Sequence, residues 1–368
     1  MKKGLLLSIV ASTVLFAGGD IAPVQPVAEA PAAACNDFYG HIGAGVIYNK
    51  TTVPASEVVT YGVAAVLGVT KEIFSGLTVN AELQGSITKG YNVTTSTSTA
   101  VVNRANLTQL NLGYTFCNTA IKVGRFAVDM GLSPLFFTDT NYFGMKDVTV
   151  DGVMVANTDL PDTVVYGAYA YRAAVHGVST TSAQIGLGGG AANKSGVAIL
   201  GFQNKSFADT TITAVGYYGI DSKDYQVAGD VSTKWCDTDI SVGGAYQNIG
   251  AVTSYVAGAI VTEHFNSFDL TLAGTYGDMA YAKYTWKTLQ AAGTGANSWA
   301  FGAKLSTDLC GYKLAAWGKY RQDKSYEAGA SVGKTISGIA FSTDVRYRHW
   351  NATGDNQTRV RAKAVYKF

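Results

Sequence analysis

The sequence has little proline, little charge and no long apolar run after its first residues. Only 6 of the 368 residues are proline and 15% are charged, and no stretch of eighteen apolar residues occurs beyond residue 17. Helical membrane spans need about 20 consecutive apolar residues, so they are excluded. A soluble chain of this length would usually show helical periodicity and a linker between domains, and neither is present beyond the N-terminus.

Signs of an enzyme, a metal site or a nucleic-acid partner are also missing. The 28 basic residues nearly balance the 26 acidic ones, which argues against a nucleic-acid ligand. No Cys-x-x-Cys spacing occurs, and the histidines at 41, 176, 264 and 349 are scattered, so we expect neither zinc nor any other cofactor. A histidine near a loop is not by itself a catalytic base, so we do not expect an enzyme.

The N-terminus carries signals for export. Lys2 and Lys3 precede an apolar run, which predicts a signal peptide over residues 1–17. Residues 18–35 contain three prolines and little bulky apolar surface, which is typical of a flexible periplasmic leader. Lipidation at Cys35 is a less favoured alternative, because the apolar run ends well before it. The remaining residues, 36–368, are predicted to form one domain.

Strict alternation of apolar and polar residues is the main pattern of this domain. In the last stretch, Thr358 to Phe368, every second residue counted back from Phe368 is apolar, while the intervening set is mostly Lys and Arg. A period of two indicates β-strands with one apolar and one wet face. A chain that ends on such a strand with Phe resembles the transmembrane β-barrels of bacterial outer membranes. That resemblance implies that Phe368 is recognised by the barrel-assembly machinery.

Alternation and turn residues together predict an all-β, antiparallel transmembrane barrel of about eighteen strands, with sixteen as the alternative. All three prolines after the leader fall in predicted loops or turns, as a closed sheet requires. The predicted strands are 37–49, 58–70, 77–88, 103–116, 121–128, 148–157, 163–172, 196–204, 210–220, 225–235, 240–250, 254–264, 268–278, 296–307, 311–322, 325–335, 339–350 and 358–368.

One stretch breaks the alternation, from Asp129 to Asp147. The motif VGRFAVD before it and LSPLFFTDTNYFGMKDVTVDG through it resemble the OprD-type porins, including the major outer membrane porins of epsilon-proteobacteria. The resemblance covers residues 123–152. It implies eighteen strands, a homotrimer and a third loop that folds inward to narrow a pore that would otherwise be wide open. The chain departs from the family at Val150-Asp151-Gly152, where Phe-Glu-Gly is usual.

The same alternation predicts which charged side chains line the lumen. We expect a basic wall that consists of Lys313, Lys319, Arg321, Arg346, Arg348, Arg359, Arg361 and Lys363. Arg125 is also placed inward, with Phe126 and Val128 outward, because an arginine facing lipid at the midplane costs about 2–4 kcal/mol. Acidic residues are expected on the opposite side: Glu82 in the wall, and Asp129, Asp139 and Asp147 in the loop.

Opposed charges across a narrow gap favour a selective pore. Two alternatives remain open: the basic residues could simply fill a wet interior, or Arg348 and Arg359 could lie at the rim and bind lipopolysaccharide. Asp139 and Asp147 could instead attach the loop to the wall. The cysteines at 117, 236 and 310 fall in predicted short turns at least four strands apart, about 20 Å, which is beyond disulfide reach. Disulfides are therefore the less favoured alternative.

The sequence thus predicts an outer-membrane porin for passive diffusion of ions and small hydrophilic solutes, with a preference for small carboxylates or zwitterions. The alternative is a structural or adhesive barrel with little conductance. The expected partners are these solutes, the membrane lipid and lipopolysaccharide, the assembly machinery and two further copies of the chain.

Overall fold

The computed structural model describes residues 38–98, 101–129, 145–146, 148–175, 182–184, 193–250, 252–278 and 298–368. The signal peptide, the leader and Cys35 lie outside these ranges. In the described part of the chain, twenty β-strands form one antiparallel sheet and eighteen of them close into a barrel. The predicted fold class and strand number are therefore confirmed. No described helix is long and apolar enough to cross a membrane.

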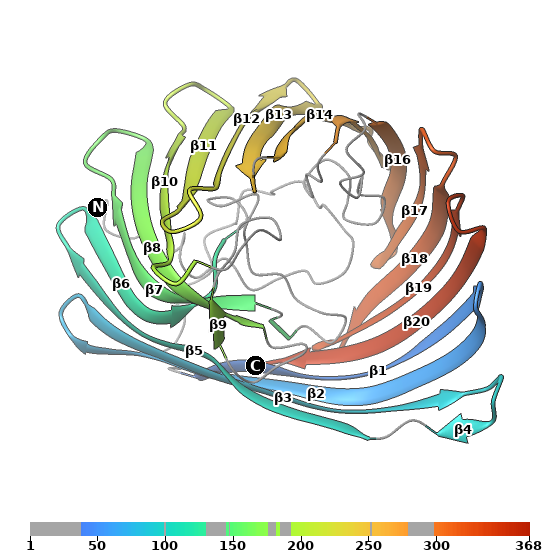
Figure 1. Ribbon diagram of the computed structural model, residues 1–368. Coiled ribbons are helices and arrows are strands. Elements are labelled where there is room, and N and C mark those ends of the chain that lie inside the picture. Colours follow the sequence, from blue (N-terminus) through green and yellow to red (C-terminus); the bar gives the residue numbers. More distant parts are fainter. Residues whose placement is uncertain are drawn as a thin grey trace.

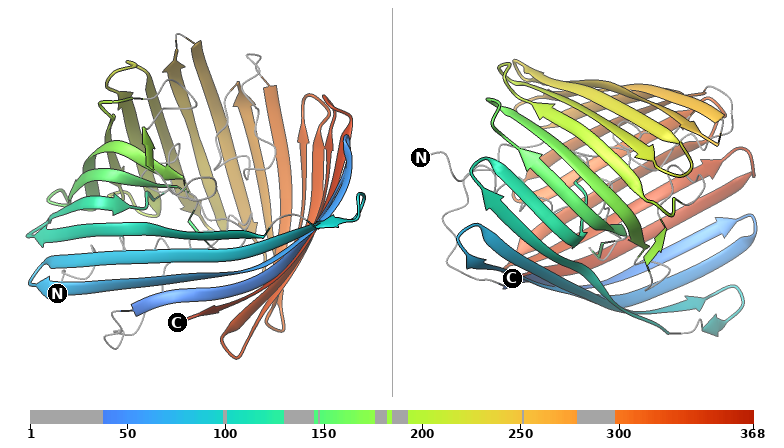
Figure 2. Two further views of the ribbon diagram at one scale, coloured as in Figure 1. Left: turned by 60° about the horizontal axis from the view of Figure 1, so that its bottom comes forward. Right: turned by 60° about the vertical axis from the view of Figure 1, so that its left-hand side comes forward.

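The strands follow one another around the ring in chain order (Figure 1) and are strongly tilted (Figure 2). Two short strands, β4 (Thr97–Ser98) and β9 (Ser182–Gln184), only extend the edges of β3 and β8. The barrel strands are β1 (Phe38–Thr52), β2 (Ala55–Phe74), β3 (Leu77–Asn92), β5 (Val102–Phe116), β6 (Thr119–Phe126), β7 (Val148–Asn157), β8 (Thr163–Val175), β10 (Val197–Asn204), β11 (Thr210–Gly219), β12 (Tyr225–Trp235), β13 (Thr238–Ile249), β14 (Val252–His264), β15 (Asp269–Gly277), β16 (Ser298–Leu309), β17 (Tyr312–Arg321), β18 (Tyr326–Ile336), β19 (Ile339–Trp350) and β20 (Asp355–Lys367).

The barrel closes where the first and last strands meet. β20 pairs with β19 on one side and with β1 on the other. At the chain end the Gly40 N–H donates to the Phe368 carbonyl at 3.0 Å, and the Phe368 N–H donates back to Gly40 at 3.1 Å. A Cβ on Gly40 would lie 2.3 Å from the Val66 carbonyl oxygen and 2.9 Å from the Phe368 ring, so only glycine permits this approach. The terminal aromatic residue therefore takes part directly in closure.

Side chains alternate between an apolar outer face and an inner face that carries both polar and apolar residues. On β3, Leu83 and Ile87 are exposed on the outside, whereas the alternate residues Glu82, Gln84 and Ser86 are buried on the inside. This is the expected pattern of a strand between lipid and lumen.

The long connections gather at one end of the barrel. The four long ones, residues 93–101, 127–147, 176–196 and 278–297, all leave from the same end. At the other end are tight turns that include Cys117, Cys236 and Cys310, and all three are exposed free thiols. The structure therefore shows no disulfide among these three cysteines.

Candidate functional site: a cationic wall and an anchored carboxylate

The inner surface of the barrel has two chemically different parts. Strands β6 to β15 contribute a buried apolar cluster, which includes Val150, Tyr166, Val215 and Ile260. Strands β17 to β20 instead contribute a dense group of charged side chains. Six basic residues, Lys319, Arg321, Arg346, Arg348, Arg359 and Arg361, share this wall with the acidic residues Glu327 and Asp344.

Glu327 lies at the centre of a group of three basic side chains on this wall. Its own side chain is nearly inaccessible, with 2% exposure. Its register partners on the two neighbouring strands are Lys319 on β17 and Arg348 on β19. Arg348 donates to Glu327 Oε2 through Nε at 3.0 Å and Nη2 at 2.8 Å. Lys319 Nζ lies 3.6 Å from Oε1, and Arg346 Nη1 lies 3.5 Å from Oε2. The single carboxylate of Glu327 therefore contacts three basic side chains.

The pair of Arg346 and Arg359 comes next along the wall, and we call this pair a step of the wall. No acidic residue in the described part of the chain neutralises its charge fully. The two arginines are direct cross-strand partners on β19 and β20. Among the described residues, no carboxylate lies within ion-pair distance of Arg359, and the Nε atoms of both arginines are buried without a hydrogen-bond partner. Below them, Asp344 accepts two bonds from Arg361 Nε at 2.8 and 2.9 Å. Like charges placed directly opposite each other repel, so this step should attract an anion.

The remaining predicted basic residues extend the wall towards both ends. Arg321 Nη2 lies 3.4 Å from Asp323 in the connection after β17. By strand alternation, Lys363 lies on the inner face of β20 and Lys313 on that of β17, near the end with the short turns. Eight of the nine predicted basic residues therefore follow one continuous wall, although their role in conduction stays a prediction.

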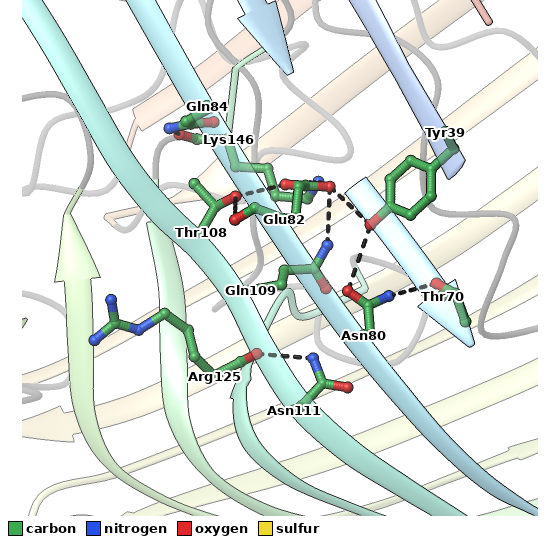
Figure 3. A network of polar contacts seen from close by, with 10 residues as sticks. All are labelled: Tyr39, Thr70, Asn80, Glu82, Gln84, Thr108, Gln109, Asn111, Arg125 and Lys146. Carbon is green, nitrogen blue, oxygen red and sulfur yellow. Dashed lines mark hydrogen bonds and ion pairs between the residues drawn. The ribbon is translucent and has the colours of Figure 1, made fainter. Parts of the chain in front are cut away.

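Glu82 lies on another part of the wall, and its carboxylate is completely enclosed by donors (Figure 3). Lys146 Nζ lies 2.7 Å from Oε1 and 2.6 Å from Oε2. Thr108 Oγ1 donates at 2.6 Å, Gln109 Nε2 at 3.1 Å and the Tyr39 hydroxyl at 3.1 Å. With 1% exposure, Glu82 cannot act as a free acidic group facing the basic wall. It instead holds Lys146, which lies two residues before the start of β7.

A β-bulge produces this arrangement. The register between β3 and β5 shifts after Glu82, so that Thr108 is the extra residue of β5. As a result, the consecutive residues Thr108 and Gln109 are both buried on the inner face, where both donate to Glu82. Bulges commonly redirect a side chain in this way. The anchor extends to the backbone, because Gln84 Nε2 donates to the Lys146 carbonyl at 2.8 Å.

The predicted orientation of Arg125 and its neighbours is wrong. Phe126 is 2% exposed and packs in the interior apolar cluster, with Val128 against it. Arg125 pairs across the strands with Leu110, which is 51% exposed on the outer face. The cost of an outward arginine is offset by Asp151, which accepts from Nε at 2.6 Å and from Nη2 at 3.0 Å. In Figure 3 its guanidinium points away from the Glu82 cluster.

The acidic side of the predicted constriction is only partly within the described residues. Asp129 is half-buried directly after β6. Asp139 and Asp147, and with them the predicted inward course of the loop, lie outside the described residues.

Solved structures with this architecture include several that are distant in sequence. OccK7 (OpdD) of Pseudomonas aeruginosa superposes with a TM-score of 0.73 at 11% identity, covering 90% of this chain and 98% of that one. The outer membrane protein OpdK of the same organism gives 0.72 at 10% identity, covering 90% and 98%, and OpdK with vanillate gives 0.69 at 11%, covering 90% and 99%. The chain has the fold of the OprD-type outer-membrane porins. No protein-family model and no curated protein sequence matches it.

Several residues of this porin-like interior were not predicted. Glu327 and Asp344 could have been found, because the alternation that places Arg346 inward also places Asp344 inward, and Tyr326 outward implies Glu327 inward. Lys146 gave no such signal, since it lies in the stretch without alternation. Its role depends on a long-range contact with Glu82.

Proposed function

We propose that this protein is an outer-membrane porin that lets ions and small hydrophilic solutes diffuse passively and that favours small carboxylates. The observation that carries the proposal is the step formed by Arg346 and Arg359, where two guanidinium groups lie opposite each other between two arginines that already have acidic partners. Guanidinium groups match the geometry of carboxylates and can bind them with two parallel hydrogen bonds. A diffusing carboxylate would therefore dwell at this step, where it would meet chiefly the half-buried Arg359, because Arg346 is only 6% exposed.

The comparisons support this proposal at the level of the fold. The structural neighbours include an outer membrane protein, and one was solved with vanillate, which is a carboxylate. We extend the proposal to location and assembly: the protein resides in the outer membrane of a Gram-negative bacterium as a homotrimer, contacts lipid and lipopolysaccharide, and is assembled through its terminal strand. The direct pairing of Phe368 with Gly40 supports the last point. Passage through the pore requires no catalysis, so we propose that the protein is not an enzyme.

Planar-bilayer recording tests the proposal. The purified barrel, shown to be folded by its heat-dependent gel mobility, should give discrete conductance steps. Acetate should reduce the current carried by chloride in a saturable manner, whereas acetamide, which has the same shape but no charge, should not. A folded protein that gives no steps would refute the porin and favour the structural or adhesive barrel. Steps that respond equally to acetate and acetamide would refute the carboxylate preference alone.

A further inference from the structure

Glu327 is buried on the inner wall next to the step formed by Arg346 and Arg359, yet its own carboxylate cannot meet a solute. At 2% exposure, both of its oxygens are covered by neighbouring side chains. Oε2 receives the two bonds from Arg348, and Oε1 lies close to Lys319. A direct contact with a passing molecule is therefore excluded, and any effect of Glu327 on transport must act through the groups that it holds.

A neutral donor fixes the position of this carboxylate. The Trp317 indole Nε1–H donates to Glu327 Oε1 at 3.2 Å. The indole lies over Gly329, where an added Cβ would stand only 2.4 Å from Trp317 Cζ2 and 2.8 Å from the Val345 carbonyl oxygen. Glycine at 329 thus makes room for the ring. Because the indole donor carries no charge, it can hold Glu327 in place without competing for the basic residues.

Arg348, in turn, is held on two sides. Its guanidinium bonds to Glu327 and also stacks at 4.9 Å from the ring centroid of Trp350 on the same strand. Arg346 has a weaker tie, with Nη1 at 3.5 Å from Glu327 and a buried Nε that has no partner. Among the residues that the structure describes, Glu327 is therefore the acidic group that contacts all three of Lys319, Arg346 and Arg348. Without it, three like charges on adjacent strands would repel one another.

We infer that Glu327 is a positioning residue for anion passage: it fixes the side chains of Arg348 and Lys319 and keeps Arg346 aimed at the step that it forms with Arg359. This inference rests on the proposed function and names how its selectivity is set. It has an unusual consequence, since a negative charge next to the path should strengthen the binding of a negative solute. A purely electrostatic effect of Glu327 would have the opposite sign.

The decisive variant is Glu327→Gln, which keeps the shape and removes the charge. If Glu327 acts only as a charge, the wall becomes more positive, so the reversal potential in a KCl gradient shifts towards anions and acetate blocks at an equal or lower concentration. If Glu327 positions the arginines, the reversal potential shifts in that direction but the half-blocking concentration of acetate rises several-fold. An unchanged or lower half-blocking concentration overturns the inference.

A second variant, Glu327→Asp, decides the question should the glutamine variant fail to fold. It keeps the charge but shortens the side chain by one methylene, which breaks the short bonds to Arg348. We expect a wild-type reversal potential with a raised half-blocking concentration, and a variant that matches the wild type in both would overturn the inference. Glu57→Gln is the matched control, because Glu57 is half-buried and, among the described residues, forms an ion pair only with the exposed Lys50, at 3.7 Å, so this variant should change neither quantity. Failure of the proposed function is separate, since it would appear in the wild type as absent steps or absent block.

Discussion

Glu82 and Glu327 are both glutamates with nearly the same burial, but they lie in two regions of the wall that differ in charge balance. Glu82, on β3, meets one lysine and three neutral donors, so that its region is close to neutral. Glu327, between β17 and β19, meets three cations and one neutral donor, which leaves positive charge in excess. The neutral region is suited to holding a segment in place, and the cationic region is suited to attracting a solute.

The largest effect is expected from removing the carboxylate of the neutral region. Glu82→Ala would leave Lys146 buried without its partner and would take one acceptor from each of three donors, of which Thr108 and Tyr39 keep a second acceptor. Breaking a buried ion pair on one side typically costs about 3–5 kcal/mol. We expect the free energy of unfolding, measured by urea titration in lipid vesicles, to fall by this order. A loss below about 1 kcal/mol would show that water replaces the carboxylate at little cost.

Removing the charges of Glu82 and Lys146 together should lower the free energy of unfolding much less than removing one of them. Glu82→Gln combined with Lys146→Met leaves no uncompensated charge, and such paired replacements are often close to neutral. We expect the double variant to recover most of the stability that Lys146→Met alone loses. A double-mutant cycle on the same urea titrations measures this coupling. Additive losses would mean that the two residues do not stabilise each other, and the comparison between the two regions would fail.

In the cationic region, Asp344→Asn should have a smaller effect than Glu327→Gln. Asp344 contacts only Arg361 at ion-pair distance among the described residues, whereas Glu327 contacts three basic side chains. We expect a shift of the reversal potential towards anions but little change in the half-blocking concentration of acetate. If Asp344→Asn weakens the block as strongly as Glu327→Gln does, the two acids share the positioning role.

The smallest effect concerns a carboxylate outside the membrane-spanning strands. Asp221, in the connection between β11 and β12, accepts from the Ser195 backbone N–H at 2.5 Å and from its hydroxyl at 2.7 Å. The backbone N–H, followed by the hydroxyl, lowers the pKa of this fully exposed carboxyl. The stabilising contribution of the Asp221 contact with Ser195 is therefore fully present above the unfolded-state pKa of Asp221. It is lost as the pH falls through the lower folded-state pKa of Asp221.

We therefore expect cleavage by pepsin near Ser195 to increase as the pH falls through this range. Asp221→Asn should show the higher cleavage already at the upper end of the range, with little further change. A wild-type protein whose cleavage does not vary with pH relative to Asp221→Asn would contradict this assignment.

The part of this architecture that follows local rules could be predicted from sequence. Period-two alternation fixed the strand number and the inward side of Arg346, Arg361 and Glu82, because each depends only on the residue's own strand. The error at Arg125 arose because a general energetic cost was applied without knowledge of Asp151, which lies on the next strand and offsets that cost. The bulge at Thr108 and the tie of Lys146 to Glu82 depend on register between strands, which alternation alone does not contain.

The central claim, that the wall formed by β17 to β20 sets the selectivity of the pore, is tested most directly by the reversal potential of the double variant Arg346→Gln with Arg359→Gln. Its matched control is Lys50→Gln, which removes an exposed basic residue near the end of β1. The account predicts that in a KCl gradient the double variant shifts clearly towards cation selectivity, while Lys50→Gln stays at the wild-type value. A double variant with the wild-type reversal potential would contradict the account.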